Sequence, residues 1–288
     1  MNASTLSRHW LISVGYCWLM MTLLLGQLPV SAHGDHQARL QHVEQAIENP
    51  AERPQALLRK LQIFHDNRQW PQVLALINSI LQEYAAQPTA PIMIEVQFWL
   101  ADTRYQQGQL AAAQAAAESF LAARPLAPRG HFLSAQIYQS QQQFKQASHH
   151  YQRALELDPL APPQWLLAYA QFQSQLPQGR LRAHQTLMQM IEQRGPLVVW
   201  VAFLIELDRQ SKDYQEAAEH IALLPENLRQ SLAWRIQHSE LLLLAKSSQR
   251  ACEQIQQLQA DLAAAHYKRS KAHEVLVEQT QLLRQQCH

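Results

Sequence analysis

Apolar and small residues recur along the middle of the chain with a fixed period. The matching pairs, all with the same separation, are Ala101 and Ala135, Leu110 and Phe144, Ala113 and Ala147, and Pro125 and Pro159. This pattern fits two helices joined by a tight turn, with small residues where the helices meet and a proline that ends the second helix. A period of about 34 residues predicts a solenoid, in which each unit buries its apolar face against its neighbours.

The copy at 128–161 resembles the tetratricopeptide repeat (TPR) family. The matching residues are Ala135, Tyr138, Phe144, Ala147, Tyr151, Ala154 and Pro159, at the family's positions 8, 11, 17, 20, 24, 27 and 32. His131 and Ser134, at positions 4 and 7, depart from the usual residue types, and the copy at 94–127 is looser. The resemblance implies an all-α, right-handed α-solenoid of helix-turn-helix repeats.

We expect about five repeats over residues 54–225. A degenerate repeat begins at Pro54, six extra residues separate it from the copy at 94–127, and a fourth continues in register to Trp165. The register slips by about two residues around 177–179, and a weak fifth repeat ends at Pro225.

Both ends of the array are predicted to be capped. Within residues 33–53, a helix from about Asp35 to Glu48 has Asp35 as its N-cap, and its apolar stripe would cover the open end of the solenoid. Residues 226–288 are predicted to form a C-terminal helical cap, in which Glu226 opens a helical segment that runs to about Lys246.

Residues 1–32 are typical of an export signal. Arg8 precedes an apolar run from Trp10 to Leu25, and small residues at 30–32 suit a cleavage site. The mature chain would begin at His33, in the periplasm or outside the cell. The run is short for a membrane span, which needs about 20 residues, so we expect no span in the mature chain, with an uncleaved anchor as the alternative.

The balance of charged residues argues against a nucleic-acid partner. Without the signal, which contains Arg8 and no acidic residue, the chain carries as many basic residues as its 23 acidic ones. A nucleic-acid binder usually has a net basic face, so no nucleic-acid partner is expected. The few glycines and the abundance of Ala, Leu and Gln favour helix throughout.

The segment that follows Lys246 fits either one long helix or a hairpin that turns near Tyr267 to Ser270. A continuous helix would hold Cys252 and Cys287 about 50 Å apart, too far to be bonded. Because paired cysteines of an exported protein are usually bridged, we favour a hairpin closed by a Cys252–Cys287 disulfide. The alternative is two unpaired small core residues.

Local motifs for catalysis are absent from the sequence, including phosphate loops, nucleophile elbows and zincin motifs. We therefore predict no enzyme and no cofactor, although an active site assembled from distant residues is a third hypothesis. The alternative to a binding protein is copper handling, because a free α-amine and imidazole at His33, joined by His36, form a chelate suited to copper. The neighbouring His149 and His150 point about 100° apart on a helix and are interpreted as solvated.

The TPR resemblance implies a concave groove lined by fixed positions of each first helix. Its candidate partner-binding residues are Glu95, Phe98, Asp102, Tyr105, Arg129, Phe132, Gln136, Gln139, Gln173, Glu206 and Arg209. Phe98 and Asp102 stand where carboxylate-clamping members have Lys and Asn. We therefore expect an extended peptide or a helix held by apolar anchors, unless the aromatic residues only pack between repeats.

The predicted function is a non-catalytic protein-protein interaction scaffold of the cell envelope. Its partner would be another protein, which the sequence does not identify.

Overall fold

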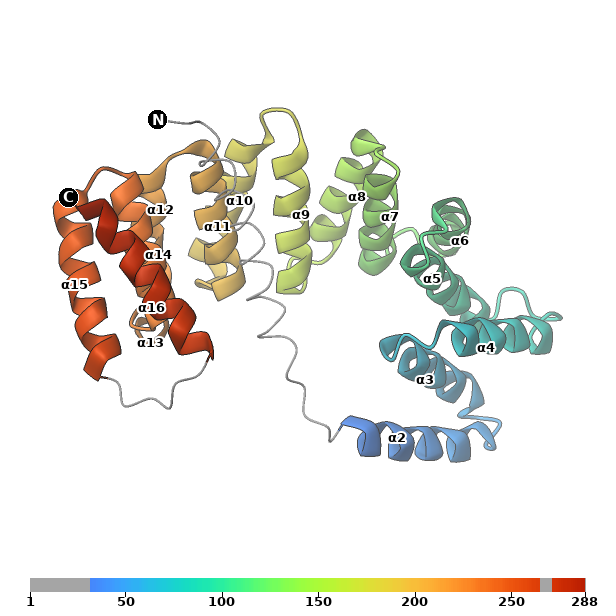
Figure 1. Cartoon of the computed structure of the whole chain (residues 1–288). Helices are drawn as coiled ribbons and strands as arrows, with labels where there is room; N and C mark the ends of the chain where they lie inside the picture. Colours follow the sequence, from blue (N-terminus) through green and yellow to red (C-terminus); the bar gives the residue numbers. More distant parts are fainter. Residues whose placement is uncertain (1–31, 265–270, 288) are drawn as a thin grey trace. The chain divides into compact units, whose positions relative to one another are not determined.

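The structure, a computed structural model, describes residues 32–264 and 271–287 (Figure 1). All elements in these ranges are helical and no strand occurs in them, so the predicted all-α fold of helix-turn-helix repeats is confirmed. The chain divides into two compact units, Met1–Gln141 and Gln142–His288. The export signal predicted over residues 1–32 lies outside the described residues except for Ala32.

The first unit contains helices that each pack on the next. They are α2 (Ala32–Ile47), α3 (Arg53–Asp66), α4 (Trp70–Glu83), α5 (Pro91–Gln106), α6 (Leu110–Ala123) and α7 (Pro128–Ser140). A proline lies in the first turn of α3, α4, α5 and α7, where its missing N–H would have no helical partner. Besides these sequential contacts, α3 contacts α5 and α5 contacts α7. The first helices of successive repeats therefore lie against each other.

The repeat pattern in this unit corresponds to buried positions. Ala101 and Ala113 are fully buried between α5 and α6, and Leu61 and Val73 are fully buried between α3 and α4. Small residues at the first pair let the helices approach, and large ones at the second fill the space between them.

The first helix covers the end of the array. Val43 is buried against Ala56 and Ile63 of α3, with Leu40 and Ile47 packed beside it. The helix begins at Ala32, earlier than predicted, so Asp35 lies inside its first turns and is not its N-cap.

The second unit continues the helical pattern. Its elements are α8 (Phe144–Leu157), α9 (Pro163–Gln175), α10 (Gly179–Arg194), α11 (Val198–Ser211), α12 (Tyr214–His220), η1 (Ile221–Leu223), α13 (Glu226–Arg229), α14 (Leu232–Leu244), α15 (Ser248–Ala264), α16 (Lys271–Arg284) and η2 (Gln285–Cys287). The core surrounds Trp200, which is fully buried and donates its indole N–H to the carbonyl oxygen of Pro163 at 3.2 Å.

One left-handed residue marks the turn before each second helix. These residues, all with positive φ, are Arg68, Gly108, Gln142, Gln178, Lys212 and Lys246. They follow one another at the repeat period except where the sequence indicated six extra residues and a two-residue slip. Lys246 shows that α14 and α15 form a further helix pair, which the sequence analysis had assigned to a cap. The segment predicted as one helix from Glu226 also differs, since the short α13 ends before α14 begins.

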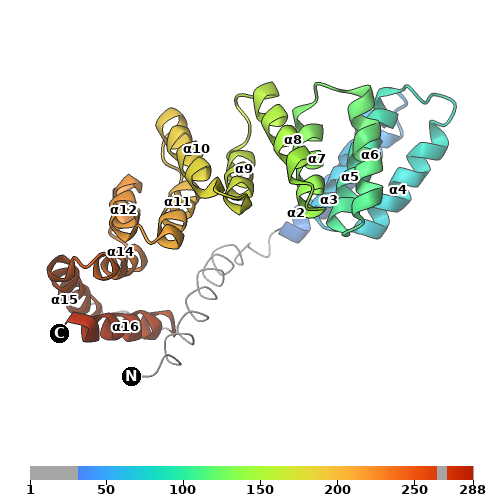
Figure 2. The ribbon, with the colours of Figure 1, turned by 90° about the horizontal axis from the view of Figure 1, so that it is seen from above.

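The chain ends in a disulfide-closed hairpin. Figures 1 and 2 show α15 and α16 side by side and next to α14, as their contacts require. The sulfur atoms of Cys252 and Cys287 are bonded, with Cα atoms 5.7 Å apart. The tail is therefore not a continuous helix, and the turn predicted near Tyr267 lies within residues 265–270, outside the described residues.

Candidate protein-binding surface

Eight of the predicted groove residues form one face of two neighbouring helices in the first unit. On α5 and on α7 they follow each other at spacings of three, four and three residues, which places them on one side of each helix. We call this surface the α5–α7 face; it consists of Glu95, Phe98, Asp102, Tyr105, Arg129, Phe132, Gln136 and Gln139, all of them partly exposed.

The charged residues of this face are paired within the protein. The Glu95 carboxylate forms an ion pair with the guanidinium of Arg124, at 2.5 Å, and accepts a hydrogen bond from that of Arg129. Asp102 lies 3.2 Å from Nε2 of His65 and accepts a hydrogen bond from the Gln106 amide. These contacts join α5 to α3 and α7, and the two guanidinium groups neutralise Glu95.

The aromatic residues of the face also contact the protein's own core. The centroid of the Phe98 ring lies 5.4 Å from that of the Phe120 ring. The Arg129 guanidinium stacks on the Phe98 ring, 4.4 Å from the Phe98 centroid. Phe98 and Tyr105 pack against a buried cluster that includes Ala101. The sequence analysis considered the alternative that the aromatic residues only pack between repeats. Phe98 and Tyr105 each bury part of their side chain in this way, and the rest of each side chain is exposed.

A tyrosine of α7 stays neutral at ordinary pH. Burial raises the pKa of the Tyr138 hydroxyl, and the nearby Glu118 carboxylate raises it further. This hydroxyl donates to Glu118 of α6 at 3.2 Å. The contact is one more polar link between neighbouring helices.

The three predicted binding residues of the second unit are less well placed to contact a partner than those of the α5–α7 face. Gln173 is buried rather than exposed, because α9 ends at Gln175 and the chain folds back at once. A Cβ atom at Gly179 would lie 1.8 Å from the Gln173 carbonyl oxygen, so α10 begins directly against this residue. Glu206 is exposed, and Arg209 pairs with Glu240 of α14 at 3.4 Å.

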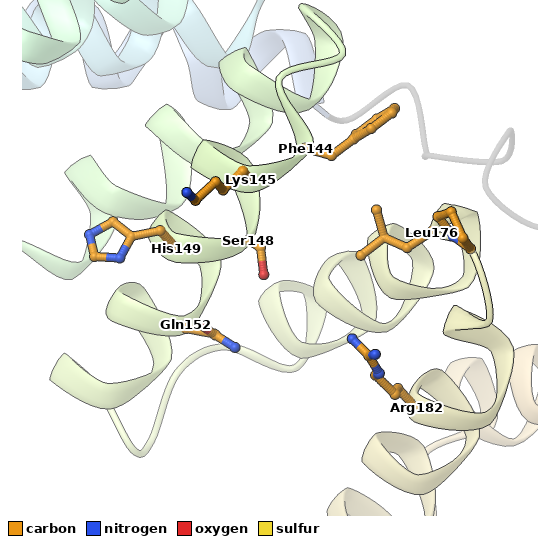
Figure 3. A pocket seen from close by; sticks show the side chains of 8 residues that line it. Phe144, Lys145, Ser148, His149, Gln152, Leu176 and Arg182 are labelled. Carbon is orange, nitrogen blue, oxygen red and sulfur yellow. The ribbon is translucent and has the colours of Figure 1, made fainter.

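A hollow of about 470 Å³ lies in the second unit between α8 and the turn from α9 to α10 (Figure 3). It is lined by Phe144, Lys145, Ser148, His149, Gln152, Leu176, Pro177 and Arg182. No carboxylate is among these residues, so its polar wall is basic. Sequence reasoning missed this hollow because it treated Phe144 as a packing residue, whereas 41% of Phe144 is exposed.

The predicted copper ligands His33 and His36 lie on α2, but their side chains are outside the described residues. Nothing in the structure supports that site. A different group was missed from the sequence: His184, Glu216 and His220 come together in the second unit. The available signal was the spacing of four residues between Glu216 and His220, which places both on one side of a helix.

Over the parts of the chain that the structure describes, no helix combines the length and apolar character that a membrane crossing requires.

Comparison with known proteins supports the repeat assignment. The tetratricopeptide repeat family model matches residues 128–161, and no curated protein sequence matches the chain. A tetratricopeptide repeat protein from Parabacteroides merdae is similar in structure, with a TM-score of 0.53 and 15% identity over 79% of this chain and 98% of its own.

Two further solved structures share the fold. PilF of Pseudomonas aeruginosa has a TM-score of 0.55 and 12% identity, over 84% of this chain and 99% of its own. Yeast Tom70 has a TM-score of 0.53 and 16% identity, over 81% of this chain and 47% of its own. At these identities the likeness concerns the fold.

Proposed function

We propose that this chain, which has the fold of TPR proteins, is a non-catalytic adaptor that holds a segment of another protein on the α5–α7 face. The TPR fold is a scaffold for protein-protein interaction. The observation that carries the proposal is a face whose acidic groups are already paired while aromatic and amide groups stay partly exposed.

The chemistry of this face favours a particular kind of partner. The guanidinium groups of Arg124 and Arg129 are already engaged by Glu95, so the face offers little attraction for a free carboxylate. The exposed parts of Phe98, Tyr105 and Phe132 suit apolar anchors, and the amides of Gln136 and Gln139 suit hydrogen bonds to a peptide backbone. The expected partner is therefore an uncharged, apolar stretch of an extended peptide or a helix.

Site-specific photo-cross-linking in cells tests the face. A photoreactive residue at Gln106 or Ser140, both exposed at the edge of the face, should give the same adduct with one partner. Ala112 and Ala115, exposed on α6, are the matched control positions. Equal adducts at all four positions, or adducts at the α6 positions alone, would contradict the assignment.

We also propose that the adaptor works outside the cytoplasm. The apolar segment near the N-terminus and the Cys252–Cys287 disulfide support this location, because such bonds persist in oxidising compartments. Fractionation with N-terminal sequencing should find the protein in the envelope, beginning at His33. Recovery from the cytoplasm with Met1 retained would contradict the proposal.

A further inference from the structure

Side chains from three consecutive helices meet in the second unit around a buried carboxylate. His184 extends from α10, and Glu216 and His220 extend from α12. One nitrogen of each imidazole and one oxygen of Glu216 all lie within 4.8 Å of each other. Asp208 of α11 lies beside them with only 4% of its side chain exposed. This arrangement is independent of the α5–α7 face.

The Nε2 atom of His184 is buried and makes no hydrogen bond. It lies 3.4 Å from Oδ1 of Asp208 and 3.5 Å from Oε1 of Glu216. These separations exceed the usual range for an N–H···O hydrogen bond, about 2.7–3.2 Å. Two ligand atoms bonded to one tetrahedral zinc ion at about 2.0–2.1 Å lie about 3.3–3.4 Å apart. The separation of 3.5 Å between His184 and Glu216 is therefore closer to that of two ligands of one metal ion than to that of a hydrogen-bonded pair.

Asp208 fixes the second imidazole. Its Oδ2 atom lies 2.7 Å from Nδ1 of His220. A neutral imidazole that donates its Nδ1–H to a carboxylate carries its lone pair on Nε2, and the carboxylate makes that nitrogen more basic. The pairing of a buried carboxylate with a histidine is the usual support for a metal-binding imidazole.

We propose that His184, His220 and Glu216 bind one divalent transition-metal ion, with Asp208 as the residue that positions His220. Two imidazoles and one carboxylate suit zinc and leave one coordination position for water. Glu216, whose side chain is 52% exposed, gives the ion a path from solvent. The bound ion ties α10 to α12 and so stabilises this pair of repeats.

Calorimetric titration of Zn²⁺ into the full chain tests the site. All samples carry His33→Ala and His36→Ala, which removes the other candidate ligands. One ion per chain should bind with a Kd below about 10 μM. Glu216→Gln should weaken binding at least tenfold. Glu219→Gln, which changes an exposed carboxylate on the same helix, should leave it unchanged.

Histidine ring NMR gives a second readout that does not depend on enthalpy. Zn²⁺ should shift the ring nitrogen resonances of both His184 and His220 and leave the exposed His42 unshifted. The proposal is overturned if no zinc binds below about 100 μM, or if Glu216→Gln binds as tightly as its parent. It is also overturned if the ring nitrogen resonances of His184 and His220 do not move under excess zinc, since neither imidazole would then bind the ion.

Discussion

Gly130 of α7 packs against α6. A Cβ atom at this position would meet Phe120 at 2.7 Å and Leu121 at 2.8 Å, and Phe120 is itself buried in the core. Gly130→Ala should therefore lower the free energy of unfolding by about 1–3 kcal/mol, because a packed core does not accept the added methyl group. Urea denaturation followed by circular dichroism measures the change.

The matched control for Gly130→Ala is Ser140→Ala, an exposed position on the same helix, which should change stability by less than about 0.5 kcal/mol. Equal stability of Gly130→Ala and the parent chain would show that α6 and α7 separate easily.

His238 makes the second unit less stable in acid. Burial lowers the pKa of His238 below 6.5, the nearby Arg250 lowers it further, and the neutral ring contacts the Gln254 amide through Nδ1 at 3.2 Å. Below pH 6.5 the unfolded chain therefore binds a proton that the folded chain excludes. The contribution to stability is complete above pH 6.5 and is lost as the pH falls towards the folded pKa.

Ring-proton NMR titration should give His238 a pKa lower in the folded protein than after denaturation. His238→Gln should reduce the loss of stability on acidification. A folded pKa at or above 6.5 would contradict the assignment.

Residue by residue, the sequence predicted the buried small positions better than the polar ones. Ala101, Ala113 and Ala147 are all fully buried, as their period required. Gln173 was misplaced because its environment depends on the turn that follows α9. The cluster of His184, Glu216 and His220 was missed because its members come from α10 and α12, which α11 separates in the sequence.

The terminal hairpin, at the scale of elements, is closed by one covalent link. The Cys252–Cys287 disulfide closes a loop with a sequence separation of 35, which is worth about 3–4 kcal/mol in the chain-entropy model. Reduction, or a Cys252→Ser and Cys287→Ser double variant, should increase hydrogen exchange in α16 above that in α11, which lies in the core around Trp200.

Thiol titration of the unfolded, unreduced chain is the control, and it should detect neither Cys252 nor Cys287. Unchanged exchange in α16 after complete reduction would show that its apolar contacts with α14 and α15 suffice.

The left-handed turn residues offer a way to stabilise the array. A non-glycine residue in this conformation is strained by about 1–2 kcal/mol, and glycine removes the strain. Lys246→Gly, at a position with φ of 61°, should therefore raise the free energy of unfolding by about 1 kcal/mol.

Gly108→Ala is the reverse experiment to Lys246→Gly and should lower stability by a similar amount. Its Cβ atom would meet nothing within 4 Å, so only the backbone conformation acts there. If Lys246→Gly and Gly108→Ala changed the free energy of unfolding in the same direction and by the same amount, backbone strain would not be the cause.

Most elements were predictable, and the exceptions have physical causes. The repeat period and the two interruptions in it were visible because proline and small residues mark them. The pair α14–α15 was not, since no proline or glycine lies in it and its turn uses Lys246 in a conformation that usually calls for glycine.

At the scale of the whole molecule, energetic effects should remain local. In a repeat array each unit contacts only its neighbours, so stability is close to a sum of local terms. Trp200→Ala removes the largest buried side chain of the second unit and should cost about 3–5 kcal/mol there. Hydrogen exchange should rise in α10 to α12 and stay unchanged in α3 and α4.

Val199→Ala, an exposed change on the same helix as Trp200, serves as the control and should alter neither region. Equal loss of protection across both units in Trp200→Ala would show global rather than local coupling.

The ion pair between Glu95 and Arg129 joins residues that occupy the same position in adjacent repeats, with a sequence separation of 34. Repeat proteins can lengthen by tandem duplication of a unit. A second copy of residues 94–127 would place a new glutamate beside Glu95, in the place that Arg129 now fills, and would leave Arg124 as its one basic neighbour. A duplicated gene segment would thus meet like-charge repulsion until a further mutation restored the alternation. The charges of Glu95 and Arg129 therefore favour the present order of these two repeats, and they disfavour lengthening of the array by duplication of residues 94–127.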